Sequence, residues 1–343
     1  MALLALPLLG TPSMAQSAVD RQEVWQAAWE DWKTDFLRPD GRVVDEFQSD
    51  ASHSEGQGYG MVLATEFGDA ESFRLMNDWA QSQLAIRQDA LMAWRWFPRR
   101  FEAVPDLNTA SDGDLFRAWG LVRAATRFGE PRYLETAQRI AQHLLWICVA
   151  EDPRRPDDLV LLPGAEGFRK PDAVTVNPSY YMPLAMREIA QATGLSEFRR
   201  LAADGEALLA EAAQARMAPD WVDVTRAGLR DPERLSYASG YDALRVPLFL
   251  IWSGRASHAA VHSAARVYRE SGGGTHAPTV VEPNGHVRET SSHGGYRAIQ
   301  SLVTCAGNGG GIPRYERGQG YFPSTLHLMS YVAWRSTSGN CLT

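Results

Sequence analysis

The stretch SHSEGQGYGMVLATEF, residues 52–67, decides how this sequence is expected to fold. Ser54 and Gln57 have the spacing of a capping box, in which two side chains satisfy free backbone groups at the start of a helix. An apolar run from Met61 follows them, so the pattern predicts that a helix begins here.

Three glycines in the first two turns oppose this helix. Gly56, Gly58 and Gly60 each cost about 1 kcal/mol relative to alanine in a helix. Glycine is used where another backbone or a ligand must approach closely. Because these glycines directly follow the acid Glu55, we expect them to clear the backbone so that a ligand can lie against its side chain.

The composition is typical of a globular protein with a sizeable core. Of 343 residues, 45% are hydrophobic and 22% are charged. The net charge is -7 without a lysine- or arginine-rich block, which argues against a nucleic-acid binder that follows phosphates. The chain has 11 Trp, 11 Tyr and 12 Phe, a surplus that leaves some aromatic rings free to line a groove.

Helical periodicity runs through most of the chain. Residues 21–37 place Trp25, Trp29, Trp32 and Phe36 on one face. Similar patterns cover 70–87, 111–128, 131–149, 179–193, 196–215, 241–253, 257–270, 293–304 and 324–336, whereas only 158–164 and 172–178 resemble strands. Many helices without a linker predict an all-α fold, and the lack of repeats favours a closed α/α toroid over a solenoid. The irregular stretch 271–292 is expected to be functional or disordered.

The N-terminus indicates export. Residues 2–9 are apolar, and residues 13–15 have the small side chains of a signal-peptidase site, although no positively charged segment precedes them. We expect residues 1–15 to be a signal peptide and 16–343 a single domain, periplasmic or secreted; a buried N-terminal helix is the alternative. Cys148 is expected to be a buried thiol, and the sequence leaves open whether Cys305 and Cys341 form a disulfide.

Acidic residues lie at or just before several predicted helix starts: Glu55, Asp112, Asp114 and Asp242. In a helical barrel the N-termini gather at one rim, so these carboxylates are expected to converge on one cleft. Two of them also have a structural explanation. Asp112 could complement a helix N-terminus capped by Thr109 or Ser111, and Asp242 could pair with Arg245.

Other chemistries lack their motifs. GQGYG (56–60) lacks the spacing of a dinucleotide-binding loop and follows no predicted strand. His258 and His262 are one helical turn apart, but the glutamate of a zinc-protease motif and a third ligand are missing from the sequence. No GxSxG nucleophile elbow occurs. We therefore expect neither a metal nor a cofactor.

Four motifs together resemble glycoside hydrolase family 8: SEGQGYGM (54–61), ASDGD (110–114), NPSYY (177–181) and YDALRVPL (241–248). The likeness extends from about residue 25 to residue 290 and is strongest to the endo-β-1,4-glucanases of bacterial cellulose-synthesis operons. It implies an (α/α)6 barrel with an open substrate cleft and inverting hydrolysis of β-1,4-glucan (cellulose) without a metal. The alternatives are the same mechanism acting on chitosan, xylan or mixed-linkage β-glucan, and a non-catalytic glucan-binding component of a secretion machine.

The resemblance also implies a role for each matching residue. Glu55 corresponds to the general acid and Asp242 to the general base. Asp112 corresponds to an acid that binds the sugar at the cleavage subsite; it is also described as a nucleophile, but inversion forms no covalent intermediate. The residues expected to bind substrate or to support the site are Tyr180, Arg245, Trp94, Trp96, Tyr59 and Asn177. The implied partner is a β-glucan, with a cellulose synthase complex as a further candidate and the chain itself monomeric.

Inversion requires two carboxyl groups in opposite protonation states, roughly 6.5–9.5 Å apart. A helix N-terminus lowers the pKa of Glu55, whereas a general acid needs a raised pKa. We therefore expect Asp112 to lie near Glu55 and, together with desolvation, to keep Glu55 protonated.

Overall fold

The computed structural model describes residues 14–272, 274–304 and 312–337. Within these ranges the chain forms the following helices: α1 (Met14–Phe36), α2 (Ser54–Phe67), α3 (Ala70–Gln83), α4 (Ser111–Arg127), α5 (Arg132–Cys148), α6 (Pro183–Thr193), α7 (Glu197–Ala212), α8 (Arg245–Trp252), α9 (Ala259–Glu270), α10 (Gly294–Thr304) and α11 (Tyr321–Ser336).

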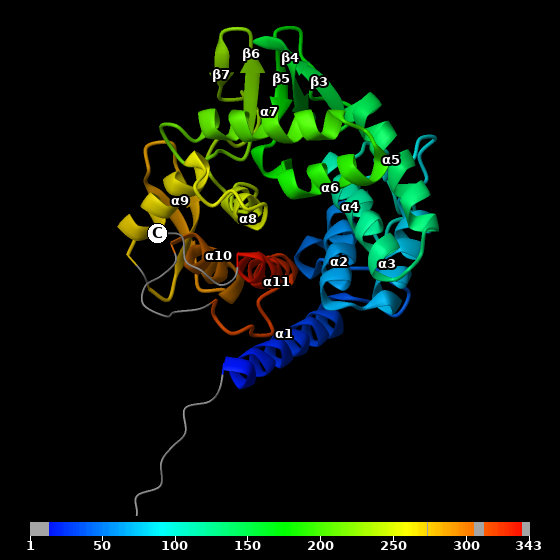
Figure 1. Cartoon of the computed structure of the whole chain (residues 1–343). Helices are drawn as coiled ribbons and strands as arrows, with labels where there is room; N and C mark the ends of the chain where they lie inside the picture. The colour runs from blue at the N-terminus through cyan, green and yellow to red at the C-terminus, as the bar shows by residue number, and fades with distance from the viewer. Residues whose placement is uncertain (1–13, 273, 305–311, 338–343) are drawn as a thin grey trace, which may run out of the picture.

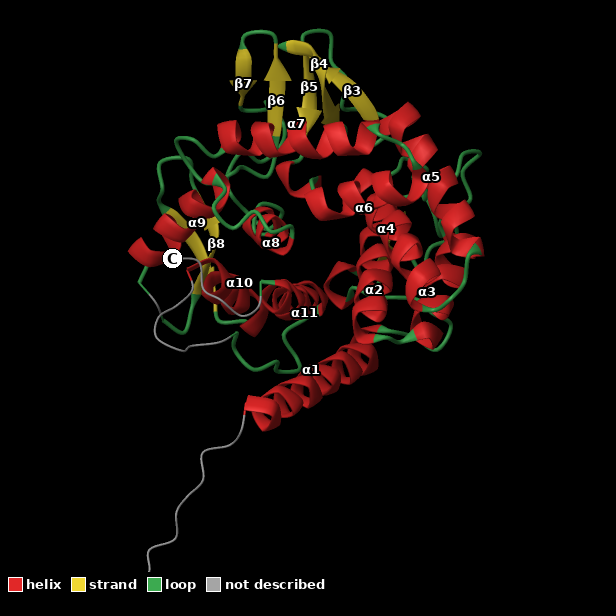
Figure 2. Ribbon diagram, in the orientation of Figure 1, coloured by secondary structure: helices red, strands yellow, loops and turns green. Residues whose placement is uncertain are grey.

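The helices form two concentric rings (Figures 1 and 2). Helices α2, α4, α6, α8, α10 and α11 surround the axis, and α1, α3, α5, α7 and α9 lie outside them. Burial agrees with this arrangement: α11 buries nearly every residue from Tyr321 to Ala333, whereas α5 buries a single stripe that includes Tyr133, Ile140 and Leu144. The ring confirms the predicted (α/α)6 barrel, and the solenoid alternative is wrong.

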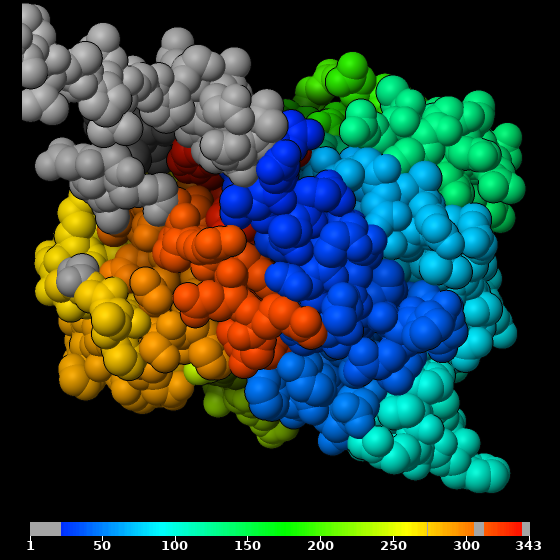
Figure 3. Space-filling view, turned by 90° about the horizontal axis from the view of Figure 1, so that it is seen from below, coloured from blue at the N-terminus to red at the C-terminus, as the bar shows by residue number. Residues whose placement is uncertain are grey.

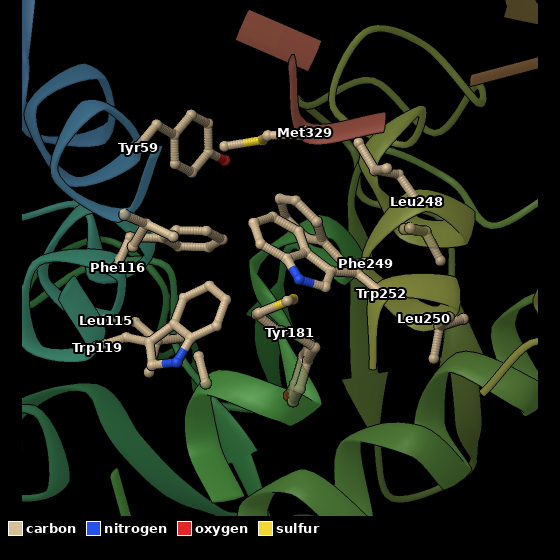
Figure 4. Close-up of a cluster of buried hydrophobic side chains, with 14 of the residues drawn as sticks. Tyr59, Leu115, Phe116, Trp119, Tyr181, Leu248, Phe249, Leu250, Trp252 and Met329 are labelled. Atoms are coloured by element: carbon tan, nitrogen blue, oxygen red, sulfur yellow. The ribbon is translucent and has the colours of Figure 1, made fainter. Parts of the chain in front are cut away.

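Aromatic side chains fill the axis of the barrel (Figure 4). Tyr59 of α2, Phe116 and Trp119 of α4, and Phe249 of α8 meet there. The ring centroids of Tyr59 and Phe116 lie 4.5 Å apart, and those of Phe116 and Phe249 lie 5.3 Å apart. Burying each ring contributes about 1.5–3 kcal/mol. Because this layer closes the interior, a ligand is confined to the rims of the barrel.

Short antiparallel strands join the helices: β1 (Ser52–His53), β2 (Arg95–Trp96), β3 (Val149–Asp152), β4 (Arg155–Leu161), β5 (Ala173–Val176), β6 (Val222–Thr225), β7 (Gly228–Arg230), β8 (Ala277–Val281) and β9 (Val287–Ser291). The predicted strand stretches coincide with β4 and β5. Residues 271–292 are not irregular throughout, because β8 and β9 form a hairpin in which Ala277 pairs with Ser291. A bridge from Val281 to Ser239 ties this hairpin to the segment before Asp242.

Helix α1 joins the first and last parts of the ring (Figure 3). The indole nitrogen of Trp32 donates to Thr325 Oγ1 at 3.0 Å, and Arg317 Nε donates to Asp35 Oδ1 at 3.0 Å. The aromatic stripe predicted for this helix is thus buried against α11 and its neighbours.

The glycines at the start of α2 serve helix packing. A Cβ on Gly58 would lie 2.8 Å from the carbonyl oxygen of Gly113 in α4, and one on Gly113 would lie 2.4 Å from Ser54 Oγ. A Cβ on Gly60 would lie 2.5 Å from Met76 Sδ in α3. The expectation that these glycines clear space for a ligand is therefore wrong, because neighbouring helices occupy that space.

The predicted capping box is also wrong. His53 is the N-cap of α2, and its side chain makes no capping hydrogen bond. The amide of Gln57 instead donates to Gly41 O at 3.1 Å and Met76 O at 3.0 Å, and it accepts from Val43 N at 2.6 Å. A fully buried side chain therefore anchors the preceding segment to α2.

Three predictions concern other parts of the chain. Cys148 is buried and free. Residues 1–13 of the expected signal peptide, and both Cys305 and Cys341, lie outside the described residues. Among the described residues, no helix combines the length and hydrophobicity needed to cross a bilayer.

We expect Gly58→Ala to lower the free energy of unfolding by about 1–3 kcal/mol, because the new methyl group forces α2 and α4 apart. Thermal unfolding measures the change. Gly274→Ala is the matched control, since no heavy atom lies within 4 Å of its added Cβ. If Gly58→Ala leaves the melting temperature unchanged and weakens ligand binding, these glycines serve access of a ligand rather than helix packing.

Candidate active site

One buried guanidinium joins the three main acids of the sequence analysis. The side chain of Arg245, at the start of α8, is 1% exposed. Its Nη1 contacts Glu55 Oε2 and lies 3.9 Å from Asp112 Oδ2, while its Nη2 donates to Asp242 Oδ1 at 2.6 Å. Glu55 and Asp112 lie in the first turns of α2 and α4, and Asp242 lies just before α8. The helix N-termini thus meet at one rim.

Glu55 and Asp242 open into the same pocket. It has a volume of about 470 Å³ and is also lined by Arg245, Tyr241 and Tyr296. The side chain of Glu55 is 21% exposed and that of Asp242 is 34% exposed, whereas Asp112 is buried behind them at 2%. Two carboxyl groups are therefore available to a ligand in one pocket.

Two of the predicted supporting residues, Asn177 and Tyr59, hold Asp242 and Arg245. Asn177 Nδ2 donates to Asp242 Oδ2 at 3.1 Å. Arg245 donates to Tyr59 Oη at 3.1 Å and to Ser179 Oγ at 2.7 Å. Asn177 and Tyr59 are fully buried, so they support the site from behind the pocket.

Tyr180 lies beside the charged cluster. Its ring centroid is 5.9 Å from Arg245 Cζ, and it is half-buried next to Trp221 at 6.3 Å. Burial raises the pKa of Tyr180 well above its usual value, and the charges of Asp112 and Asp242 raise it further. The hydroxyl therefore stays protonated and can donate a hydrogen bond.

Two predicted stacking residues lie outside this pocket. Trp94 precedes β2, its Nε1 donates to Asp106 Oδ2 at 2.8 Å, and a neighbouring guanidinium, that of Arg95, lies 4.0 Å from its ring. Trp96 packs edge-on against Trp79, with ring centroids 5.6 Å apart. Because the carbonyl of Trp94 accepts from Ser54 N at 2.9 Å, Trp94 is still anchored beside the start of α2.

The protonation of the acids follows from burial. Burial raises the pKa of Glu55, Arg245 opposes this shift, and the charge of Asp242 adds to it. Burial raises the pKa of Asp112 well above its usual value, and the charge of Glu55 raises it further. Burial, rather than the charge of Asp112, is therefore the main cause of the raised pKa of Glu55. Among the described residues, Asp112 Oδ2 is buried without a hydrogen-bond partner.

Asp114 belongs to the core rather than to the cleft. It accepts hydrogen bonds from Met92 N at 2.9 Å and from the hydroxyl of Thr109. Ser111 donates to Leu162 O at 2.7 Å, so neither Thr109 nor Ser111 caps α4; the N-cap is Ala110. Burial raises the pKa of Asp114 to about 7.

The C-terminal part of the chain contributes pocket residues that the sequence analysis missed. His293, Tyr296, Tyr321 and Phe322 line the pocket with Glu55. They follow residue 290, beyond the resemblance, and their only signal in the sequence is the surplus of aromatic residues. Asp45 also lines the pocket.

Of the two histidines one helical turn apart, His258 and His262, the first has a structural role. His258 is the N-cap of α9, where its Nδ1 accepts from Ala260 N at 3.1 Å. In the part of the chain that the structure describes, no three His, Cys, Asp or Glu side chains are grouped as a metal site requires.

Comparisons with known proteins agree with the fold. Residues 5–335 match the family model described as "Glycosyl hydrolases family 8". The chain is 34% identical over 315 residues to a "Probable endoglucanase" of Novacetimonas hansenii, covering 89% of each chain. It is 35% identical over 230 residues to an endoglucanase of Cellulomonas uda, covering 66% of this chain and 63% of that one. The solved endo-β-1,4-glucanase of Acetobacter xylinum superposes with a TM-score of 0.85 at 32% identity, covering 92% of this chain and 99% of that chain.

We expect the stability of Asp114→Asn relative to the wild type to increase as pH rises from 5 to 7. The folded-state pKa of Asp114 is about 7, above the unfolded value of 3.8, so its contribution to stability is present at low pH and is lost toward pH 7. Asparagine cannot ionise, and its gain over wild type should grow by about 1 kcal/mol or more. Denaturant unfolding at both pH values measures the gain.

Asp69→Asn is the control for this experiment. The pKa of Asp69 is lowered to about 2, so this residue is ionised in both the folded and the unfolded state between pH 5 and 7. The difference between Asp69→Asn and wild type should stay constant across this range. A constant difference for Asp114→Asn as well would show that Asp114 is already ionised at pH 5.

Proposed function

This chain belongs to glycosyl hydrolase family 8, and we propose that it cleaves β-1,4-glucan chains internally, with inversion at the anomeric carbon. The proposal is supported by its similarity to proteins named as endoglucanases, among them the endo-β-1,4-glucanase of Acetobacter xylinum. The alternative that it only binds glucan is weakened by the pair of carboxyl groups in its pocket.

The observation that carries the proposal is the difference between these two carboxyl groups. Glu55 is largely buried and its pKa is raised, as a general acid requires. Asp242 is more exposed, and Arg245 and Asn177 donate to its two oxygens. It can therefore accept a proton from a water molecule in the pocket. Glu55 is assigned as the general acid and Asp242 as the general base.

The proposed reaction proceeds in one displacement. Glu55 gives its proton to the glycosidic oxygen, and Asp242 removes a proton from a water that attacks the anomeric carbon from the opposite face. The carbon–oxygen bond to the leaving sugar breaks, and the new hydroxyl has the inverted configuration. Asp112, with its unpartnered Oδ2, is assigned to a hydroxyl of the sugar at the cleavage point. Tyr180 is assigned to the attacking water.

The aromatic residues divide between substrate and core in this proposal. Trp94, anchored at the start of α2, is assigned to stacking on a sugar away from the cleavage point. Trp96 has Arg42 over its ring at 5.1 Å and Trp79 at its edge, so it is assigned to support of this wall. Tyr59 and Asn177 support Arg245 and Asp242.

The remaining proposals concern the whole chain. Residues 16–343 are proposed as the single catalytic domain and residues 1–15 as a signal for export to the periplasm or the exterior. The chain is proposed to act as a monomer on a β-glucan, in connection with bacterial cellulose synthesis. A cellulose synthase complex is the candidate partner, and a pull-down with the synthase subunits tests it.

Proton NMR during cleavage of cellohexaose tests the reaction. The α-anomer of the new reducing end should appear first, because inversion at a β-linkage gives an α-product. The β-anomer appearing first would mean a retaining mechanism and would overturn the assignment of Asp242 as base. A parallel reducing-sugar assay on carboxymethylcellulose, chitosan, xylan and mixed-linkage glucan tests the polymer, and the greatest activity is expected on the β-1,4-glucan.

Variants of the two acids separate catalysis from binding. Glu55→Gln and Asp242→Asn should each lower kcat by about 100- to 10,000-fold while cellohexaose binding is retained. Asp114→Asn is the matched control in the same region and should keep its kcat. Wild-type protein that binds cellohexaose and never cleaves it would instead identify a glucan-binding component.

A further inference from the structure

One buried carboxylate holds both ends of the turn that carries Asp242. Asp220 lies two residues before the start of β6 and is 7% exposed. Its Oδ1 accepts hydrogen bonds from the backbone nitrogens of Gly240 and Ala243, both at 2.9 Å, and its Oδ2 accepts from Ser236 Oγ at 3.1 Å. The residues between these two backbone contacts are Tyr241 and Asp242, which both line the pocket.

The local sequence is shaped around this carboxylate. A Cβ on Gly240 would lie 2.5 Å from Asp220 Oδ2, so glycine is needed there for the carboxylate to approach. The backbone of the same segment is held as well, since Asp220 N donates to Ala238 O at 2.8 Å and Ser239 pairs with Val281 of β8. Asp220 and the β8–β9 hairpin thus fix this segment from two sides.

The side chain of Asp242 alone does not explain how its turn is fixed. Its carboxylate is held by Arg245 and Asn177, yet it is 34% exposed and lies before the first helical residue of α8. A general base must be placed within a fraction of an ångström of its water, and a misplacement of about 1 Å can lower the rate about 100-fold. The backbone of the turn therefore needs its own anchor.

We propose that Asp220 is a positioning residue, which fixes the backbone of residues 240–243 so that Asp242 meets the attacking water. This inference rests on the proposed role of Asp242 as general base. Burial, and then the charge of Asp242, raise the pKa of Asp220 to about 6. Burying a carboxyl group costs free energy unless hydrogen bonds compensate for the lost water. The oxygens of Asp220 accept such bonds from both ends of the turn.

Asp223, three residues further along the chain, offers a matched comparison. It is fully buried in β6, and its carboxylate accepts from Thr175 Oγ1 at 2.6 Å and Lys170 Nζ at 2.9 Å. These contacts lie within the sheet β5–β6–β7 and its neighbours rather than at the turn before α8. Loss of Asp223 therefore removes a buried carboxylate without releasing Asp242.

Steady-state kinetics on cellohexaose, below the melting temperature of each variant, test the proposal. Asp220→Ala should lower kcat by about 10- to 100-fold and leave KM within about two-fold. Asp220→Asn should restore most of the rate, because its amide oxygen can still accept from Gly240 and Ala243. Asp223→Ala should keep kcat within about two-fold. An unchanged kcat in Asp220→Ala, or an equal loss in Asp223→Ala, overturns the proposal.

A double-mutant comparison separates positioning from general destabilisation. In an Asp242→Asn background, Asp220→Ala should change the residual rate by less than about two-fold, because the group that it positions is already gone. The same loss in both backgrounds overturns the proposal. If Asp220→Ala does not fold, Gly240→Ala displaces the same carboxylate and should give the same pattern. Full activity of Asp242→Asn by itself would mean instead that the proposed function of Asp242 has failed.

Discussion

The rim of this barrel depends on one cation that is almost completely removed from water. Removing a guanidinium from water costs several kcal/mol unless opposite charges and hydrogen bonds surround it. The carboxyl groups of Glu55, Asp112 and Asp242 surround Arg245, and Tyr59 and Ser179 supply further hydrogen-bonding oxygens. The acids depend on the arginine in turn, since its charge opposes the repulsion that arises when more than one of them is ionised. The cation therefore fixes where α2, α4 and α8 begin relative to each other.

The packing of α2 on α4 is what lets two of these acids reach one guanidinium. Gly58 and Gly113 allow the first turns of the two helices to touch, where larger residues would hold them apart. Each glycine weakens its own helix by about 1 kcal/mol. The aromatic layer beneath the site, with Tyr59 against Phe116, offsets this loss by burying large apolar surfaces between the same helices. The geometry of the site and the stability of the core thus share one helix contact.

The sequence predicted the helices of this protein better than it predicted which residues their side chains contact. Periodic apolar residues identified the helices, because a buried face must repeat with the helical turn, and acids at helix starts pointed to one rim. What a side chain bonds to is set by distant segments: Gln57 has the spacing of a cap, yet it bonds to Gly41, Val43 and Met76. The same limit hid Tyr296, whose helical pattern shows burial but not that the pocket lies beside it, and Tyr321, which precedes the predicted helical stretch 324–336.

The acids of the site are fixed in different ways because they lie in different kinds of backbone. Glu55 and Asp112 belong to the first turns of helices, so the hydrogen bonds of α2 and α4 hold their backbones. Asp242 lies before α8, in a turn that must remain open enough for a ligand and water to reach its carboxylate. Exposure and exact placement are opposing demands on one residue, since a loose turn is easy to reach and a packed one is not. Contacts from outside the turn, through Asp220 to its backbone and through Arg245 and Asn177 to its carboxylate, meet both demands.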